Sequence, residues 1–299
     1  MKLFSPQYYK KFACIADRCR HSCCVGWEIS VDSETLGKYK HDGREDILEN
    51  ISETDDGAEI ILRDDGRCPF LDERGLCRII SECSDSYTSE ICREHPRFYH
   101  RVGDVSEVGL GAVCEEAARL ILSEEDFSSF DFLGEYEKCA ADETDFDTLF
   151  YREEIFDLLS EKNLSYREKI TNLSEKFGVS DVLSGDFSDA FSELELLEEE
   201  NCELLAVGSV ENRPEVQTFG ERFLAYLVFR HVSVAESYEN LRARVGFCLL
   251  LLKIFENATA KIADATLDTI ADVARRISSE IEYSEDNTSA LIFEFESSI

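Results

Sequence analysis

Four cysteines fall within eleven residues near the start of the chain, in the stretch CIADRCRHSCC, which contains Cys14, Cys19, Cys23 and Cys24. Five more precede residue 115: Cys68, Cys77, Cys83, Cys92 and Cys114. Nine of the 12 cysteines therefore lie in the first part of the chain, and the other three are isolated. Thiols gathered in this way are cross-linked as disulfides, buried in a core or bound to a metal, and each of these alternatives constrains how this part of the chain folds.

Burial as small hydrophobic side chains does not suit the first four thiols, because they lie among Asp, Arg and His. Disulfides need an oxidising compartment, and the N-terminal sequence lacks the apolar core of a signal peptide. The longest apolar run, VGFCLLLL at 245–252, is far shorter than the roughly 20 residues of a membrane span. We therefore expect a soluble, cytoplasmic protein without membrane contact, whose reduced thiols bind a metal.

The spacing of the cysteines bears on which metal they bind. Structural zinc sites usually consist of paired C-x2-C knuckles, and the chain has none. The first spacings are four, three and zero residues. Because cysteine thiolates are the usual ligands of iron–sulfur clusters, the pattern favours iron–sulfur and leaves zinc as the alternative metal.

The formal net charge of −33 limits the choice of partner. A field of this sign repels phosphate backbones, so we expect no binding of nucleic acid. The same field attracts a basic substrate or protein partner, although an excess of carboxylates also serves solubility alone.

Short apolar runs between turn residues predict a cysteine-rich α+β region at the N-terminus. Strands are expected at 58–62, 68–71 and 76–80, followed by a hairpin over 97–113 and a helix from residue 114. The rest of the chain predicts helices. The expected fold class is therefore mainly α, with a cysteine-rich metal-cluster domain at 1–125 and an all-helical domain at 145–299.

Residues 165–178 give the clearest helical signal. Ser165 and Glu168 have the spacing of a capping box, and Gly178 stands where a helix C-cap belongs. Further helices are expected over 192–205, 215–232, 239–255 and 265–283. Their apolar stripes are typical of a bundle core rather than of a cofactor site, and the charges of the acidic stretch 192–205 are typical of a solvated face.

Several motifs of the chain resemble those of the flagellin lysine-N-methylase family. They are YYKKFACIADRCRHSCCVGWEISVD, CPFLDERGLCRI, ICREHPRFYH and CEEAARLIL, and the helical ending ISSEIEYSEDN is similar as well. The cysteine motifs also resemble a broader family of small cysteine-cluster proteins described as zinc- or iron-chelating. The resemblance covers nearly the whole chain and is most specific in its N-terminal part.

The resemblance implies S-adenosylmethionine-dependent methylation of lysine side chains on flagellin, together with a 4Fe–4S cluster held by cysteines. Eight cysteines match the family pattern and are the candidate metal ligands: Cys14, Cys19, Cys23, Cys24, Cys68, Cys77, Cys92 and Cys114. A single cluster needs four thiolates. The cysteines outside the pattern are expected to be ordinary residues: Cys83, Cys139, Cys202 and Cys248.

Three further residues are candidates for binding S-adenosylmethionine. Trp27 is able to stack against a sulfonium or, alternatively, to anchor a core. Arg93 and Arg97 are able to hold the carboxylate of the cofactor or, alternatively, to pair with local acids. A lysine amine has an ordinary pKa of about 10.4 and must lose a proton before it attacks. A tyrosine or carboxylate of the cysteine-rich part is the expected base.

A non-enzymatic function fits the same residues. The chain lacks the glycine-rich motif of classical methyltransferases. The alternative to a protein-lysine methyltransferase is therefore an iron–sulfur or zinc module that docks a protein partner through its helices.

Overall fold

The structure is a computed structural model that describes residues 1–55, 57–135, 146–205 and 213–298. The chain packs into two compact units. The larger unit consists of residues 1–12 and 98–299, and the smaller unit consists of residues 13–97. The domain division expected from sequence, 1–125 and 145–299, stays a prediction, and residues 136–145 of its boundary lie outside the described residues.

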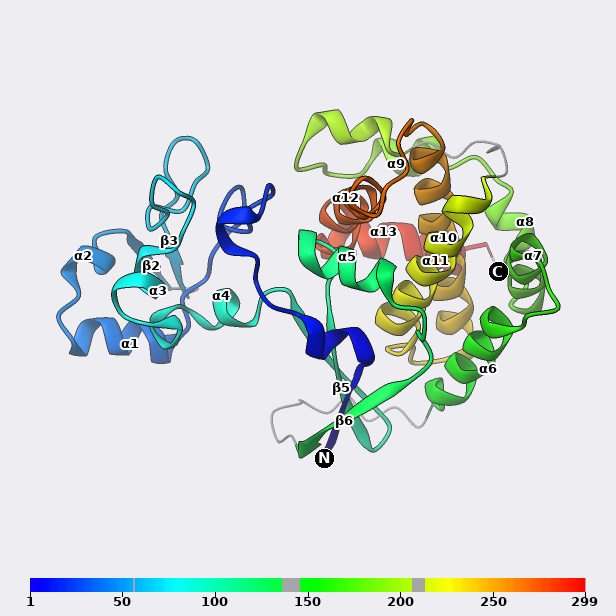
Figure 1. Cartoon of the computed structure of the whole chain (residues 1–299), viewed down its shortest axis with the longest axis horizontal. Coiled ribbons are helices and arrows are strands. Elements are labelled where there is room, and N and C mark those ends of the chain that lie inside the picture. Colours follow the sequence, from blue (N-terminus) through cyan, green and yellow to red (C-terminus); the bar gives the residue numbers. More distant parts are fainter. Residues whose placement is uncertain (56, 136–145, 206–212, 299) are drawn as a thin grey trace. The chain divides into compact units, whose positions relative to one another are not determined.

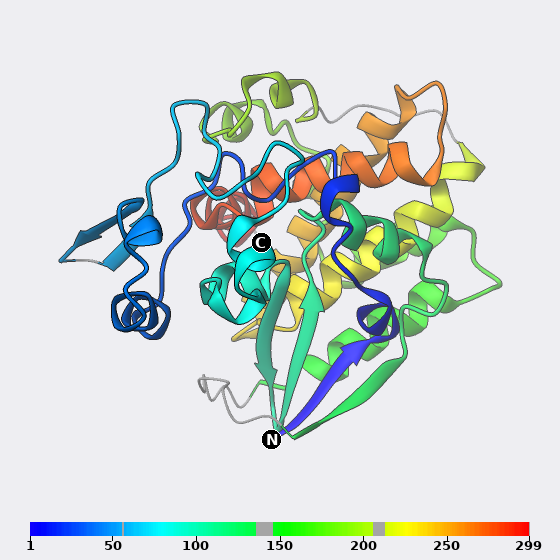
Figure 2. The same ribbon diagram turned by 60° about the vertical axis from the view of Figure 1, so that its left-hand side comes forward.

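A four-stranded mixed sheet lies in the larger unit, with the strand order β4-β5-β1-β6. Its strands are β1 (Lys2–Pro6), β4 (Arg97–Val102), β5 (Val105–Leu110) and β6 (Phe130–Glu135). Strand β1 pairs parallel to β5 and antiparallel to β6, with Phe4 opposite Glu107 and Phe132, respectively. Figure 2 shows the strands side by side. The predicted hairpin is confirmed as β4 and β5, whereas β1 and β6 were not predicted.

Helices make up most of the rest of the described part of the larger unit (Figure 1). The α-helices are α5 (Glu115–Ser123), α6 (Thr148–Ser160), α7 (Tyr166–Lys176), α8 (Ser180–Leu183), α9 (Ser188–Ser192), α10 (Pro214–Leu227), α11 (Tyr238–Ala260), α12 (Leu267–Ile277) and α13 (Glu285–Glu296). Two π-helical turns, η5 (Val228–Val232) and η6 (Ser278–Glu282), extend α10 and α12. The 3-10 turns are η1 (Gln7–Lys11) and η4 (Glu199–Glu203). The predicted mainly α fold class is confirmed.

Local sequence signals explain where α7 begins and ends. The Ser165 backbone N–H donates to the Glu168 carboxylate over 2.8 Å, and the Glu168 backbone N–H donates to the Ser165 hydroxyl over 3.4 Å. This reciprocal capping box is the predicted one. Gly178 has a φ of +64°, a left-handed conformation that glycine adopts without strain. In contrast, the predicted helix over 192–205 is wrong: only η4 forms there, because neighbouring glutamates repel one another along a helix.

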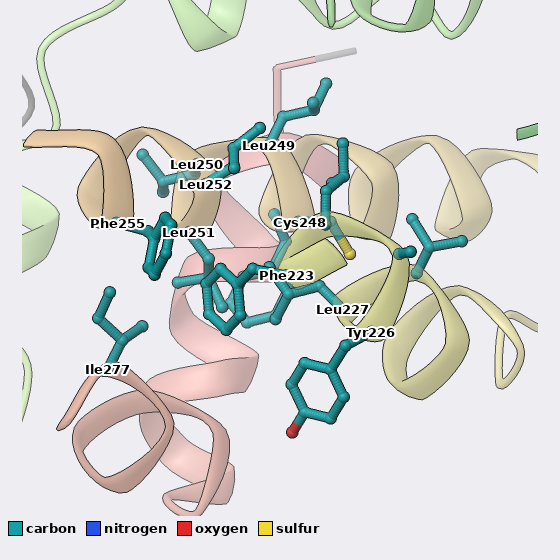
Figure 3. Close-up of a cluster of buried hydrophobic side chains, with 14 of the residues drawn as sticks. Phe223, Tyr226, Leu227, Cys248, Leu249, Leu250, Leu251, Leu252, Phe255 and Ile277 are labelled. Atoms are coloured by element: carbon teal, nitrogen blue, oxygen red, sulfur yellow. The ribbon is translucent and has the colours of Figure 1, made fainter. Parts of the chain in front are cut away.

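Helix α11 is the centre of the hydrophobic core. All residues from Val245 to Leu252 are buried, and α11 contacts α7, α8, α10, α12 and α13. Figure 3 shows Phe223 of α10 beside Phe255 of α11, whose ring centroids lie 4.7 Å apart. Among the described residues, no helix combines the length and apolar composition that crossing a membrane requires.

A buried ion pair ties the sheet to the helices of the larger unit. Glu107 of β5 accepts from both terminal nitrogens of Arg152 of α6, over 2.6 and 2.7 Å. His100 of β4 lies 2.8 Å from the same carboxylate. The three side chains are almost fully buried. Because a buried charge is costly without a partner, this contact fixes how α6 lies against the sheet.

The smaller unit has its own short elements and a small apolar core. Its elements are η2 (Ala16–Arg18), α1 (Ser33–His41), α2 (Glu45–Leu48), β2 (Ile51–Thr54), β3 (Gly57–Ile60), α3 (Arg78–Glu82), η3 (Asp85–Tyr87) and α4 (Glu90–Glu94). The core includes Ile29, Tyr39, Ile47, Phe70 and Ile79. The strand expected at 58–62 is found as β3. The strands expected at 68–71 and 76–80 are wrong, because that region forms one isolated bridge, Leu71 with Cys77, and then helix α3.

The close approach of α11 and α13 makes Gly246 sensitive to substitution. A Cβ at this position would lie 2.6 Å from Cε1 of the buried Phe295. We expect Gly246→Ala to lower the free energy of unfolding by about 1–3 kcal/mol through overpacking, as measured by denaturant titration. Gly37→Ala in α1, where a Cβ meets nothing within 4 Å, is the control. It should be neutral or stabilising, and equal losses in the two variants would contradict the packing argument.

The Glu107 ion pair predicts a pH dependence of stability. Burial alone would raise the pKa of Glu107, but Arg152 and His100 hold it at about 2, below the ordinary 4.5. A lowered folded-state pKa means that the pair stabilises the fold above pH 4.5 and that this contribution is lost as the pH falls towards 2. We expect Glu107→Gln to be destabilising at neutral pH and to approach the parent below pH 4.5. Glu135→Gln, which removes a largely exposed carboxylate, should match the parent throughout.

Candidate metal centre

The smaller unit holds every predicted metal ligand except Cys114, which is the N-cap residue of α5 in the larger unit. Within the smaller unit, Cys24, Cys68 and Cys77 pack at the apolar core. Cys14, Cys23 and Cys92 are exposed, and Cys19 is half-buried. The predicted set is therefore divided between a group at the core and a group at the surface.

Backbone hydrogen bonds bring three of these cysteines to one place. The Cys68 N–H donates to the Cys24 carbonyl over 2.9 Å, and Leu71 bridges to Cys77. The turn between Cys68 and Cys77 is closed by Asp72, whose carboxylate accepts from the N–H groups of Arg74 and Leu76, over 2.8 and 2.9 Å. Aspartate makes such local turns readily. Residues 44 positions apart in sequence, Cys24 and Cys68, thus become neighbours.

Cys92 reaches the same region on helix α4. Asp32 orients this helix, because its carboxylate accepts from the Glu90 N–H and from the Thr35 N–H of α1, each over 2.8 Å. The Ser89 hydroxyl donates to the Cys92 sulfur over 3.2 Å. A hydrogen bond of this kind fixes the direction of a thiol.

Burial and neighbouring charges shift the pKa values of the thiols at the core. Burial, together with the charges of Cys24, Cys77 and Cys92, raises the pKa of the Cys68 thiol to about 12. Burial also raises the pKa of Cys77. In contrast, a hydrogen bond with the Cys23 side chain lowers the pKa of Cys24 to about 7. Within the described ranges, no three or more His, Cys, Asp or Glu side chains lie together in a group that could hold a metal ion.

The residues expected to bind the cofactor also lie in the smaller unit and make local contacts there. Trp27 is half-buried. A guanidinium nitrogen of Arg93 donates to the Thr88 carbonyl. Arg97 Nη1 donates to the Arg93 carbonyl over 3.2 Å. These contacts order the chain around α4, and a role of Trp27, Arg93 and Arg97 in cofactor binding stays a prediction.

The cysteines outside the predicted pattern have varied surroundings. Cys83 accepts from Arg44 Nη1 over 2.5 Å. Cys202 is exposed on η4, whereas Cys248 is buried in α11. Cys139 lies outside the described residues. Their treatment as ordinary residues stays a prediction.

Sequence reasoning missed Tyr39 and Ser89 as neighbours of the thiols. Tyr39 is buried, its hydroxyl donates to the Tyr87 carbonyl, and burial followed by the charges of Cys92 and Cys77 raises its pKa. A tyrosine held protonated in this way is a poor base at neutral pH. Ser89 had one signal in the sequence, its place three residues before Cys92 on a short helix. Tyr39 had none, because it meets Cys77 and Cys92 only through the tertiary fold.

The chain is similar to curated lysine-N-methylases over part of its length. It is 29% identical over 130 residues to the lysine-N-methylases of Salmonella typhimurium and Salmonella choleraesuis, and the match covers 40% of this chain and 32% of each relative. It is 28% identical over 130 residues to the flagellar biosynthetic protein FliU of Salmonella muenchen, covering 40% of this chain and 77% of the relative. The matched segment thus spans about a third of the length of the curated lysine-N-methylases.

Neither a protein-family model nor a solved structure matches the chain. The partial match to the Salmonella proteins nevertheless confirms the resemblance to the lysine-N-methylase family.

The turn closed by Asp72 provides a test of how Cys68 and Cys77 are brought together. Asp72→Ala removes the acceptor of two backbone N–H groups, so we expect faster hydrogen exchange at the amides of residues 74–77, measured by mass spectrometry. Asp64→Ala changes an exposed aspartate a few residues earlier and is the matched control. Exchange that is unchanged in Asp72→Ala, or equally faster in Asp64→Ala, would show that the aspartate does not hold this turn.

Proposed function

We propose that this chain is an S-adenosylmethionine-dependent protein-lysine N-methyltransferase that acts on flagellin and holds a 4Fe–4S cluster in its smaller unit. The similarity to curated lysine-N-methylases carries the proposal, and the name of the flagellar protein FliU supports the choice of flagellin. The gathering of thiols in the smaller unit supports the cluster.

The donor chemistry of the site fits an iron–sulfur cluster. The candidate ligands are Cys24, Cys68 and Cys77, which pack at the core of the smaller unit, and Cys92 on helix α4. Four thiolates are what one cluster requires. The lowered pKa of Cys24 favours its thiolate form, and a bound cation would favour the thiolate form of the others as well. When bound, the cluster would link the chain segments that carry Cys24, Cys68, Cys77 and Cys92 through iron–thiolate bonds.

The chain's own residues have separate tasks in the proposed reaction. Arg93 or Arg97 would hold the carboxylate of S-adenosylmethionine, because a guanidinium binds a carboxylate through two parallel hydrogen bonds. Trp27 would stack against the sulfonium. The excess of carboxylates, with a net charge of −33, favours the approach of a lysine-bearing protein segment.

Methyl transfer itself is a displacement. The lysine nitrogen forms a bond to the methyl carbon, the carbon–sulfur bond breaks, and the electron pair leaves with the sulfur as S-adenosylhomocysteine. The amine proton must pass to a base or to water beforehand. The step involves no radical. We therefore expect most of the rate acceleration to come from alignment of the nitrogen, the methyl carbon and the sulfur.

The proposal predicts linked losses of iron and activity. Anaerobically purified parent protein should contain about four iron and four sulfide per chain and should methylate flagellin, as measured by mass spectrometry. Cys24→Ser keeps the size of the side chain but removes the soft sulfur donor, so both iron and methyl transfer should fall. Cys83→Ser, in the same unit but outside the proposed ligand set, is the matched control and should keep both.

Three outcomes would contradict this proposal in different ways. Colourless protein with stoichiometric zinc would replace the cluster with a structural zinc site. Iron-loaded parent protein that never methylates flagellin would favour the non-enzymatic module that docks a partner. Full iron and full activity in Cys24→Ser would remove this cysteine from the ligand set.

A further inference from the structure

Two π-helical turns of the larger unit face each other through charged side chains. Turn η5 carries Arg230 and His231, and turn η6 ends at Glu282. Each π turn directly follows an α-helix, α10 and α12 respectively. A π-helical turn inserts an extra residue into a helix. Such turns are frequent at functional sites, because they direct side chains to positions that a regular α-helix would not reach.

The carboxylate of Glu282 is the centre of this network and is inaccessible to solvent. It lies 2.7 Å from His231 Nε2 and 3.3 Å from Arg230 Nε. The Tyr226 hydroxyl is 3.1 Å from both of its oxygens. Figure 3 shows the same hydroxyl directed away from the apolar side chains of the core. Burial opposes a charge at Glu282, but Arg230 and His231 keep its pKa below the ordinary value.

The network also holds the segment 109–114, which leads from strand β5 to helix α5. The Ala112 N–H donates to the Tyr226 hydroxyl over 3.0 Å. At Gly111, an added Cβ would collide with the Tyr283 hydroxyl and come within 2.8 Å of Arg230 Nη1. The Arg230 guanidinium lies 4.7 Å from the Phe98 ring centroid and 4.6 Å from the Tyr283 ring centroid. The backbone before α5 is therefore fixed by a buried polar contact and by close packing.

Cys114 ends this segment. Its N–H donates to the Gly111 carbonyl over 3.3 Å, and its carbonyl accepts from Ala118 in the first turn of α5 over 2.9 Å. The thiol is half-buried, and its charge contributes to the raised pKa of Tyr283. The direction in which the thiol leaves the backbone is thus set by the same turn that Tyr226 and Arg230 hold.

We infer that Tyr226, Arg230 and Glu282 are positioning residues for the Cys114 thiol. The functional consequence rests on the family resemblance behind the proposed function: Cys114 is one of the eight cysteines of the family pattern, although it is not among the four thiols proposed to hold the cluster. The network would then make correct placement of a pattern cysteine depend on the packing of α10 and α12, far from that cysteine in sequence.

Thiol labelling tests this inference without any metal or substrate. Tyr226→Phe removes the hydroxyl that joins Ala112 to Glu282. We expect it to raise the alkylation rate of Cys114 several-fold in metal-free protein, measured site by site by mass spectrometry. Tyr166→Phe is the matched control, because it removes another buried tyrosine hydroxyl of the larger unit, on α7 and outside this network. It should leave Cys114 unchanged.

Two other cysteines of the same unit separate positioning from general loosening. Exposed Cys202 should react equally in all variants, and buried Cys248 should stay protected as long as the core is folded. If Tyr226→Phe makes Cys248 reactive, the same labelling is repeated with Glu282→Gln. This substitution keeps the shape of the side chain and weakens the ion pair with Arg230. The inference would be overturned if Cys114 is alkylated at the same rate in the parent and in whichever of the two variants, Tyr226→Phe or Glu282→Gln, leaves Cys248 unreactive.

A parent protein that never methylates flagellin would overturn the proposed function and leave the labelling result intact.

Discussion

The middle of helix α11 has protein on every side, and the architecture of the larger unit depends on this constraint. Its segment from Val245 to Leu252 exposes almost no surface, so each neighbouring helix must bring an apolar face to it. Helices α10, α12 and α13 do so directly. Burial of this kind is the dominant favourable term in folding. It also explains why Gly246 is required where Phe295 approaches the α11 backbone.

Buried charges then specify how the sheet and the turns lie against that core. Glu107 and Arg152 tie strand β5 to α6, and Glu282 and Arg230 join the two π turns. A buried ion pair adds little net stability compared with apolar side chains in the same place. Removing one partner is nevertheless costly, because the other charge then stays buried without a partner. Both networks lie around the segment that runs from β5 into α5. The thiol of Cys114 is therefore presented by one of the most constrained parts of the larger unit.

The smaller unit is organised differently, because its apolar core is small and includes thiols. Cys24, Cys68 and Cys77 pack beside residues such as Phe70 and Ile79. Domains with a core of this size commonly depend on a metal or on cross-links for stability. Binding by the proposed thiolates would contribute directly to folding. This dependence gives one physical reason for so many cysteines, in addition to any role in catalysis.

The sequence by itself determined the features that depend on neighbours along the chain. These include the capping box at Ser165, the left-handed Gly178, the apolar stripes of the helices and the cysteine-rich region with its motifs. The tertiary structure decided what depends on distant partners. Strands β1 and β6 are strands because they pair with each other across more than 100 residues, and Cys24 and Cys68 are neighbours because a backbone hydrogen bond joins them. Local propensity carries no record of such pairings, since each contact exists only after the intervening chain has folded.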